Sequence, residues 1–94
     1  MAAYVIVEID VRDPDLYAEY MEAAAPCIAR HGGKYLARGG LAEALEGAPP
    51  KRIVVLEFAD AQAAKSWFHS PDYQAVSVPR RQASTARFIV VAGL

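Results

Sequence analysis

The chain has 94 residues, enough for one domain, and 54% of them are hydrophobic, well above the share found in disordered chains. Ten Lys and Arg against eleven Asp and Glu give a formal charge of -1, and this balance disfavours nucleic-acid binding, which usually needs a concentrated basic face. No apolar run approaches the length of a membrane span, and the single cysteine, Cys27, cannot form an internal disulfide. We therefore expect one cytoplasmic domain over residues 1–94, with neither nucleic acid nor membrane as a partner.

The first elements are a strand and a helix. Residues 3–11 are rich in β-branched side chains and alternate in polarity, which predicts a strand. Asp13 followed by Pro14 is a typical helix start, and apolar residues then recur at helical spacing until Gly32. Pro26 falls inside this pattern, so we expect the helix to kink there or to end a few residues early.

Glycine pairs bracket the next strand. Residues 34–38 predict a short strand, and Gly33, Gly39 and Gly40 are expected to take a positive φ or to allow a close approach of neighbouring strands. Residues 41–50 could form a helical turn, but their glycine and paired prolines make an irregular hairpin arm the favoured prediction.

The second half repeats the order of elements. Residues 52–58 predict a strand and residues 61–69 a helix. Ser70 is placed to cap a further helical segment, which Pro79 should limit. Residues 87–92 predict the last strand. The expected fold class is α+β, a ferredoxin-like βαββαβ arrangement with a four-stranded antiparallel sheet and one extra helical piece.

One face of this sheet would be left bare by the helices. It carries both aliphatic and acidic side chains, namely Ile6, Glu8, Ile53, Val55 and Glu57. Such a face is too apolar to stay wet and too charged for an ordinary core. We therefore expect the sheet of a second subunit to cover it, giving a homodimer that shares a barrel and a cavity.

The string HGGKYLARGG, followed by RIVVLEF, then AKSWFHSPDYQA and an arginine near position 80, resembles the small bacterial family DUF1330. The resemblance extends from Tyr4 to Gly93 and rests on the combination of GG-x-Y-L-x-R-GG, E-F and W-x-x-S-x-x-Y. It implies a ferredoxin-like protomer of the dimeric α+β barrel superfamily, in a family without an established activity. Superfamily relatives include cofactor-free monooxygenases, isomerases and haem-dependent enzymes, so the fold alone does not define a reaction.

Arg38 is the first candidate for a binding residue. If Leu36 and Arg38 share the inward face of their strand, the guanidinium enters the cavity and could hold a carboxylate or an enolate. The alternative is a structural ion pair with Glu8 or Glu57, both of which we expect nearby. These two glutamates could also bind ligand or act as base or acid, although the ion pair is the favoured role for them.

Two aromatic residues could line the cavity. Trp67 lies on the apolar stripe of its helix, which favours core packing over ligand binding. Tyr73 carries a phenol that needs a hydrogen-bond partner when buried, which makes it the better candidate.

Cys27 and His31 lie four residues apart, on one face of the first predicted helix. Two ligands do not make a metal site and no third is spaced to join them, so we expect no metal. His31 could act as a proton shuttle if it borders the cavity, or it could simply cap the helix end. The sequence has no P-loop, dinucleotide fingerprint or CxxC motif, so no cofactor is expected.

Two functional hypotheses remain open. The first is a cofactor-independent enzyme that acts on a small anionic or carbonyl substrate, with Arg38, Glu57 and His31 as the catalytic candidates. The second is a non-catalytic dimeric module for binding or structure. The absence of a nucleophile and base at recognisable spacing leaves a small-molecule-binding dimer as the favoured interpretation, with enzymatic activity undecided.

Overall fold

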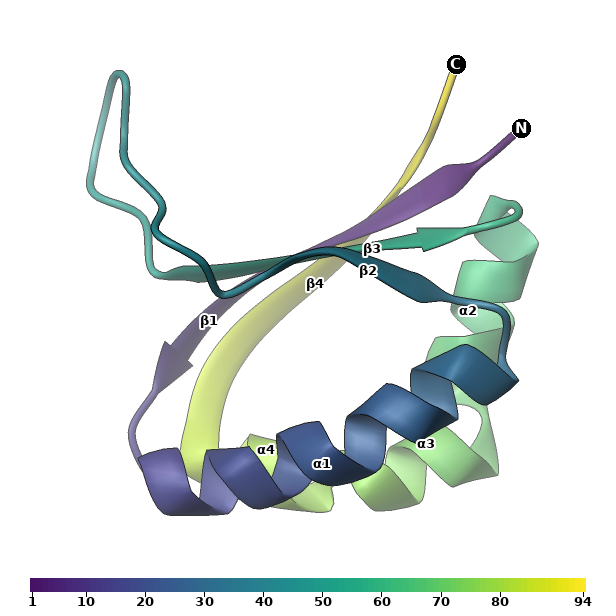
Figure 1. Cartoon of the computed structure of the whole chain (residues 1–94), viewed down its shortest axis with the longest axis horizontal. Helices are drawn as coiled ribbons and strands as arrows, with labels where there is room; N and C mark the ends of the chain where they lie inside the picture. Colours follow the sequence, from purple (N-terminus) through teal and green to yellow (C-terminus); the bar gives the residue numbers. More distant parts are fainter.

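A single antiparallel sheet carries all four helices on one of its faces (Figure 1). The computed structural model describes all residues, 1–94. The elements in chain order are β1 (Ala3–Val11), α1 (Pro14–Arg30), β2 (Lys34–Arg38), β3 (Arg52–Phe58), α2 (Ala61–His69), α3 (Pro71–Val76), α4 (Val78–Ala83) and β4 (Ser84–Ala92).

The strand order is β2-β3-β1-β4, so β1 lies in the centre and pairs with both β3 and β4. All three pairings are antiparallel. This order, with a helix after β1 and helices after β3, is the predicted ferredoxin-like βαββαβ arrangement, and that prediction is confirmed.

The core lies between the sheet and the helices, because alternate strand residues point to that side. The buried strand residues include Val5, Val7, Ile9, Val54, Leu56 and Phe58, as the alternation predicts. Trp67 is the largest fully buried side chain, with its ring centroid 5.3 Å from that of Phe58 and 4.4 Å from that of Tyr73.

The opposite, open face of the sheet has no helix over it (Figure 1). Its β1 residues Ile6 and Glu8 are half-buried, and Ile89 on β4 is 45% exposed. The register places Ile6 between Val55 and Ile89, which makes an apolar row across three strands.

Side-chain caps fix the starts of three helices. Asp13 Oδ1 accepts a hydrogen bond from Leu16 N at 3.1 Å, and Asp60 Oδ1 accepts one from the first turn of α2 at 2.7 Å. Ser70 Oγ accepts from Tyr73 N at 3.0 Å and so begins α3, as predicted.

The structure tests two predictions about prolines. Helix α1 continues past Pro26 to Arg30, so the predicted early end is wrong; Pro26 lies on the exposed side, where water can satisfy the carbonyl that loses its partner. Pro79 limits the segment capped by Ser70, as predicted, because α3 ends at Val76 and a separate helix, α4, begins at Val78. Pro79 itself lies in the first turn of α4, where a missing N–H has no intrahelical acceptor to lose, and β4 then begins at Ser84 instead of Arg87.

The glycine predictions are confirmed at two positions and wrong at a third. A side chain at Gly33 would place its Cβ 2.6 Å from Phe58, so this glycine allows the close approach of α1 and β3. Gly39 has φ +76°, and a Cβ there would lie 2.6 Å from the guanidinium of Arg52. Gly40 has neither a positive φ nor a close neighbour.

Residues 41–50 contain no helix or strand and form an irregular arm that projects from the sheet (Figure 1). Its leucines, Leu41 and Leu45, are fully exposed. The helical alternative for this segment is therefore excluded.

Candidate functional site

Arg38 points to the helix-covered side of the sheet because β2 contains a bulge. The pairing with β3 runs from Tyr35 opposite Leu56 to Ala37 opposite Val55, so Leu36 is an extra residue. Tyr35 and Arg38 consequently share a face, and the Arg38 guanidinium lies 4.8 Å from the Tyr35 ring centroid. The prediction that Leu36 and Arg38 share a face is wrong.

The two candidate glutamates lie on the open face, away from Arg38. Glu57 Oε1 is 3.2 Å from Lys34 Nζ, and Glu8 stands opposite Arg87 in the β1–β4 register. The predicted ion pair of Arg38 with Glu8 or Glu57 is therefore wrong, because the bulge moves the guanidinium to the other side of the sheet.

A pocket between the sheet and the helices, here called the arginine pocket, collects three guanidinium groups and no carboxylate. Its enclosed space is about 20 Å³, roughly the room for one water-sized group. Its polar and aromatic lining comprises Tyr17, Tyr20, Tyr35, Arg38, Arg52, Trp67, Arg80 and Phe88.

Arg80 is the most buried of the three arginines, with only 7% of its surface exposed. Its guanidinium carbon lies 4.5 Å from the Phe88 ring centroid and 5.9 Å from that of Tyr20. The side chain makes no hydrogen bond or ion pair within the protein, and its Nε is fully buried. Burial of a guanidinium without an ion pair is costly, and the rings of Phe88 and Tyr20 are the groups in this structure that face its charge.

Sequence reasoning missed Arg80, although a local signal was present. Small residues flank it at helical spacing, with Ser77 and Ala83 three residues away on either side, and all three are buried. An arginine centred on a face of small residues is unlike an arginine on a solvated face.

Arg52 on β3 and Arg38 on β2 are the other two arginines that line the arginine pocket. The Arg52 guanidinium carbon lies 5.2 Å from the Tyr17 ring centroid, and its Nη2 lies 3.6 Å from Met21 Sδ. Its Nε is buried without a partner. Gly39 leaves the room through which this guanidinium passes.

Two phenols form a buried pair beside the arginines. The hydroxyl oxygens of Tyr20 and Tyr73 are 2.8 Å apart, so the partner that a buried Tyr73 was expected to need is Tyr20. Burial raises the pKa of Tyr20, and the neighbouring Tyr73 raises it further. Tyr20 therefore stays neutral and donates or accepts hydrogen bonds without acting as a base.

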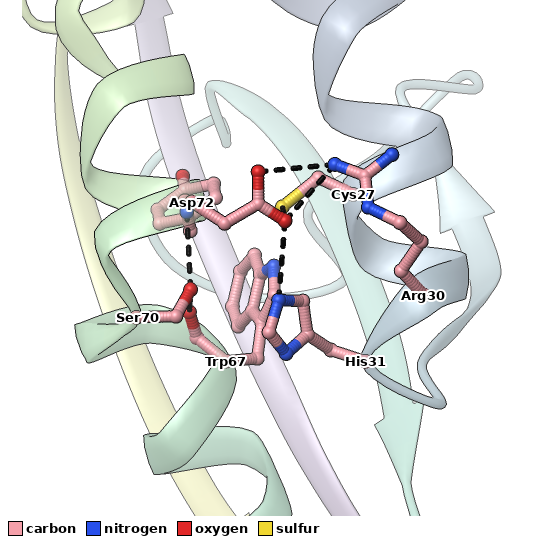
Figure 2. A network of polar contacts seen from close by, with 7 residues as sticks. Cys27, Arg30, His31, Trp67, Ser70 and Asp72 are labelled. Carbon is pink, nitrogen blue, oxygen red and sulfur yellow. Dashed lines mark hydrogen bonds and ion pairs between the residues drawn. The ribbon is translucent and has the colours of Figure 1, made fainter.

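His31 and Trp67 lie at a second polar group, at the C-terminal end of α1 (Figure 2). His31 Nε2 is 3.3 Å from Asp72 Oδ2, and Cys27 Sγ is 3.4 Å from the same oxygen. Arg30 Nη2 donates to both oxygens of Asp72, at 3.0 and 2.9 Å. His31 does not line the arginine pocket, and Trp67 is buried between the two sites.

The expectation that no third ligand joins Cys27 and His31 is wrong, because Asp72 lies beside both of them. It lies in the first turn of α3, and the packing of α3 on α1 brings it to them. Its own pKa is lowered, chiefly by the hydrogen bond from Arg30.

None of the helices has both the length and the apolarity that crossing a membrane requires. No curated protein matches the sequence. Solved structures similar to the chain include a protein of unknown function from Rhodopseudomonas palustris, with TM-score 0.77, 20% identity, and coverage of 99% of this chain and 82% of that one.

Two further similar structures carry informative descriptions. SnoaB from Streptomyces nogalater, a cofactor-independent oxygenase, has TM-score 0.70 and 16% identity, with coverage of 99% of this chain and 93% of SnoaB. A dimeric ferredoxin-like protein of unknown function from Thermobifida fusca has TM-score 0.65 and 18% identity, with coverage of 99% and 92%. Identities this low establish the shared fold alone. The model of the family described as "Domain of unknown function (DUF1330)" matches residues 2–94, and the chain belongs to that family.

Proposed function

We propose that this protein binds a small organic anion in the arginine pocket and does so as a homodimer. The observation that carries the proposal is the unpaired burial of Arg80 in a pocket whose lining holds three arginines and no carboxylate. A carboxylate or enolate placed there would relieve the cost of the buried charge and accept the fork of hydrogen bonds that guanidinium groups offer.

The size of the pocket limits how the ligand would enter. About 20 Å³ holds only the charged head of an organic anion, so the remainder would lie at the mouth. Arg38 forms part of that mouth and is exposed, and its long side chain can move aside. Arg38 then serves as an outer cation and Arg80 as the inner anchor, a reversal of the order expected from the sequence.

The chemistry available in the pocket is stabilisation of negative charge. Its lining contains neither Glu, Asp nor His, so Glu57 and His31 are not placed to act there as catalytic base. Guanidinium groups and neutral phenols would lower the free energy of the oxyanion or enolate that forms when a ligand loses its proton to water. Compounds that ionise readily, such as 1,3-dicarbonyls and phenols, fit this better than compounds that need a strong base.

A second candidate function is cofactor-independent oxygenation of such an anion. The likeness in fold to SnoaB favours it, and the same charge stabilisation would serve an electron-rich enolate that reacts with O₂. The non-catalytic alternative, a binding module, predicts anion binding without turnover. Oxygen consumption over a panel of 1,3-dicarbonyls and polyphenols separates the two.

The proposal of a homodimer is based on the open face of the sheet. The row Val55, Ile6 and Ile89 would stay in water in a monomer, and the similar Thermobifida fusca protein is described as dimeric. We expect Ile89→Lys to shift the protein toward monomer in sedimentation velocity, whereas Leu45→Lys on the arm should leave the dimer intact. A parent protein that sediments as a monomer at micromolar concentration contradicts this part of the proposal.

The binding test compares two arginines on opposite faces. Calorimetric titration with benzoate and acetoacetate, and with the neutral benzamide, should show binding of the anions only. Arg80→Met should weaken that binding at least tenfold, while Arg87→Met, on the open face of β4, should leave it unchanged. Equal loss in both variants, or binding of benzamide as tight as benzoate, would overturn the assignment of the pocket.

A further inference from the structure

Three side chains of different ligand type converge where α1 ends and α3 begins (Figure 2). Cys27 and His31 are one helical turn apart on α1, and Asp72 comes from the first turn of α3. Their ligand atoms, which are Sγ, a ring nitrogen and a carboxylate oxygen, all lie within 4.8 Å of one another. We propose that Cys27, His31 and Asp72 form a binding site for Zn²⁺ or a cation of similar chemistry, with a fourth position open to water.

The spacing of the ligand atoms suits a tetrahedral cation. Bonds of 2.0 to 2.3 Å at tetrahedral angles place neighbouring ligand atoms roughly 3.3 to 3.6 Å apart. Asp72 Oδ2 is 3.4 Å from Cys27 Sγ and 3.3 Å from His31 Nε2, so two of the three edges already have this length. Only the distance between the sulfur and the imidazole nitrogen, which is at most 4.8 Å, has to shorten, by up to about 1.5 Å.

The chemistry of the three donors selects the kind of metal. A thiolate, an imidazole and a carboxylate together are typical of Zn²⁺ and Co²⁺ sites, whereas Ca²⁺ and Mg²⁺ prefer oxygen ligands alone. Cys27 is buried, while the side chains of His31 and Asp72 are 28% and 39% exposed. The sulfur is therefore shielded from solvent, while the imidazole and the carboxylate face solvent, from which a cation and a water ligand can enter.

Trp67 supplies an independent observation. Its indole Nε1–H is buried and has no hydrogen-bond partner in the protein, and Figure 2 shows the nitrogen on the side of the ring that faces the three ligands. A thiolate at Cys27 would give this unpaired N–H an acceptor, so Trp67 would support the metal-bound form from outside the ligand set.

Arg30 pairs with the carboxylate that would bind the cation. Its Nη2 lies within 3.0 Å of both Asp72 oxygens, so the positive charge of Arg30 balances the negative charge of the carboxylate. Arg30 is exposed and can swing away, or it can retain Oδ1 while the metal takes Oδ2. On binding, the Cys27 S–H proton passes to solvent and a sulfur–metal bond forms, with no change of oxidation state.

The test uses the whole protein after treatment with a chelator, with Co²⁺ as the probe. Cys27 is the only cysteine, so a near-ultraviolet thiolate-to-cobalt band can come from no other residue. We expect the parent to develop this band and the visible bands of tetrahedral cobalt, saturating at one ion per chain, and Zn²⁺ to displace the Co²⁺. A parent protein without the thiolate band at millimolar Co²⁺ overturns the proposal.

Four variants decide which residues bind. Cys27→Ser should lose the near-ultraviolet band, and circular dichroism would confirm that it remains folded. The chain has two histidines: His31→Ala should weaken binding at least tenfold, and His69→Ala is the matched control that should not. Arg30→Gln should tighten binding severalfold, because it removes the competing charge. Parent affinity in His31→Ala would overturn the three-residue site, whereas unchanged affinity in Arg30→Gln would mean that Arg30 keeps Oδ1 and leaves Oδ2 to the metal.

Discussion

The two faces of the sheet carry opposite arrangements of charge, although the same strands build both. On the helix-covered face, Arg38, Arg52 and Arg80 gather without any carboxylate among the lining residues. On the open face, acids are matched by cations, as in Lys34 with Glu57 and Lys51 with Asp10. The net charge of -1 hides this separation completely.

The partners proposed for the two faces follow from this difference. A pocket of unmatched positive charge attracts a small anion, because its field is not cancelled locally. A face of apolar rows with balanced ion pairs suits a large surface of the same composition, such as a second copy of the sheet. The predictions below test whether the two faces behave as differently as they look.

The largest expected difference lies between two neighbouring residues of β3. Leu56 on the covered face is 2% exposed, so Leu56→Ala should lower the free energy of unfolding by about 3 kcal/mol at any protein concentration. Val55→Ala on the open face should cost less, and its effect on the melting temperature should vary with protein concentration if a second copy covers that face. Equal, concentration-independent losses in both variants would remove the contrast between the faces.

Gly33 and Gly40 together test how tightly the helix-covered side of the sheet is packed. Gly33→Ala forces a Cβ to 2.6 Å from Phe58 and 2.9 Å from Ile28, and we expect a loss of about 2 kcal/mol in denaturant titration. Gly40 has open space around it, so Gly40→Ala is the matched control and should change stability by less than about 0.5 kcal/mol. A Gly33→Ala protein as stable as the parent would mean that this corner is loosely packed.

Alkaline titration examines the buried phenols of the covered side. Burial raises the pKa of Tyr20, so the folded protein keeps a proton that the unfolded chain loses near the ordinary tyrosine pKa of about 10. Stability contributed by Tyr20 is therefore fully present below pH 10 and declines above it, by about 1.4 kcal/mol per pH unit. Tyr20→Phe should reduce the slope of stability against pH by that amount, and an unchanged slope would contradict it.

The smallest effect belongs to the rim of the open face. Lys51 Nζ is 3.9 Å from Asp10 Oδ2, and both side chains are more than half exposed. Lys51→Gln should change the free energy of unfolding by less than about 0.5 kcal/mol, and the change should vanish at high salt. A loss above about 1 kcal/mol that persists in salt would indicate that the pair is buried in the assembled protein.

Local patterns were sufficient to predict the fold. The alternation in β1 and β3 identified both faces of the sheet, and Asp13 and Ser70 marked helix starts through hydrogen bonds made within three residues. These features depend on neighbours in the sequence, so one sequence contains all the information they need.

The candidate sites depend on geometry that local patterns do not contain. Counting alternate residues placed Arg38 beside Glu8 and Glu57, but the count assumes an unbroken pleat, and the bulge at Leu36 reverses it. Asp72 joins Cys27 only through the packing of α3 on α1, which spans 45 residues of sequence. Such contacts are fixed by tertiary packing and leave no local signature.

The central position of β1 has a consequence for synthesis on the ribosome. β1 emerges first but pairs along one edge with β4, which begins only at Ser84, and Gly93 N closes this pairing by donating to Ala2 O at 2.8 Å. At 5 to 20 residues per second, the nascent chain waits on the order of ten seconds with that edge of β1 unpaired. Adjacent ribosomes on one messenger therefore hold matching edges of unpaired backbone N–H and C=O groups near each other. Chains of this topology should depend on chaperones more than their small size suggests.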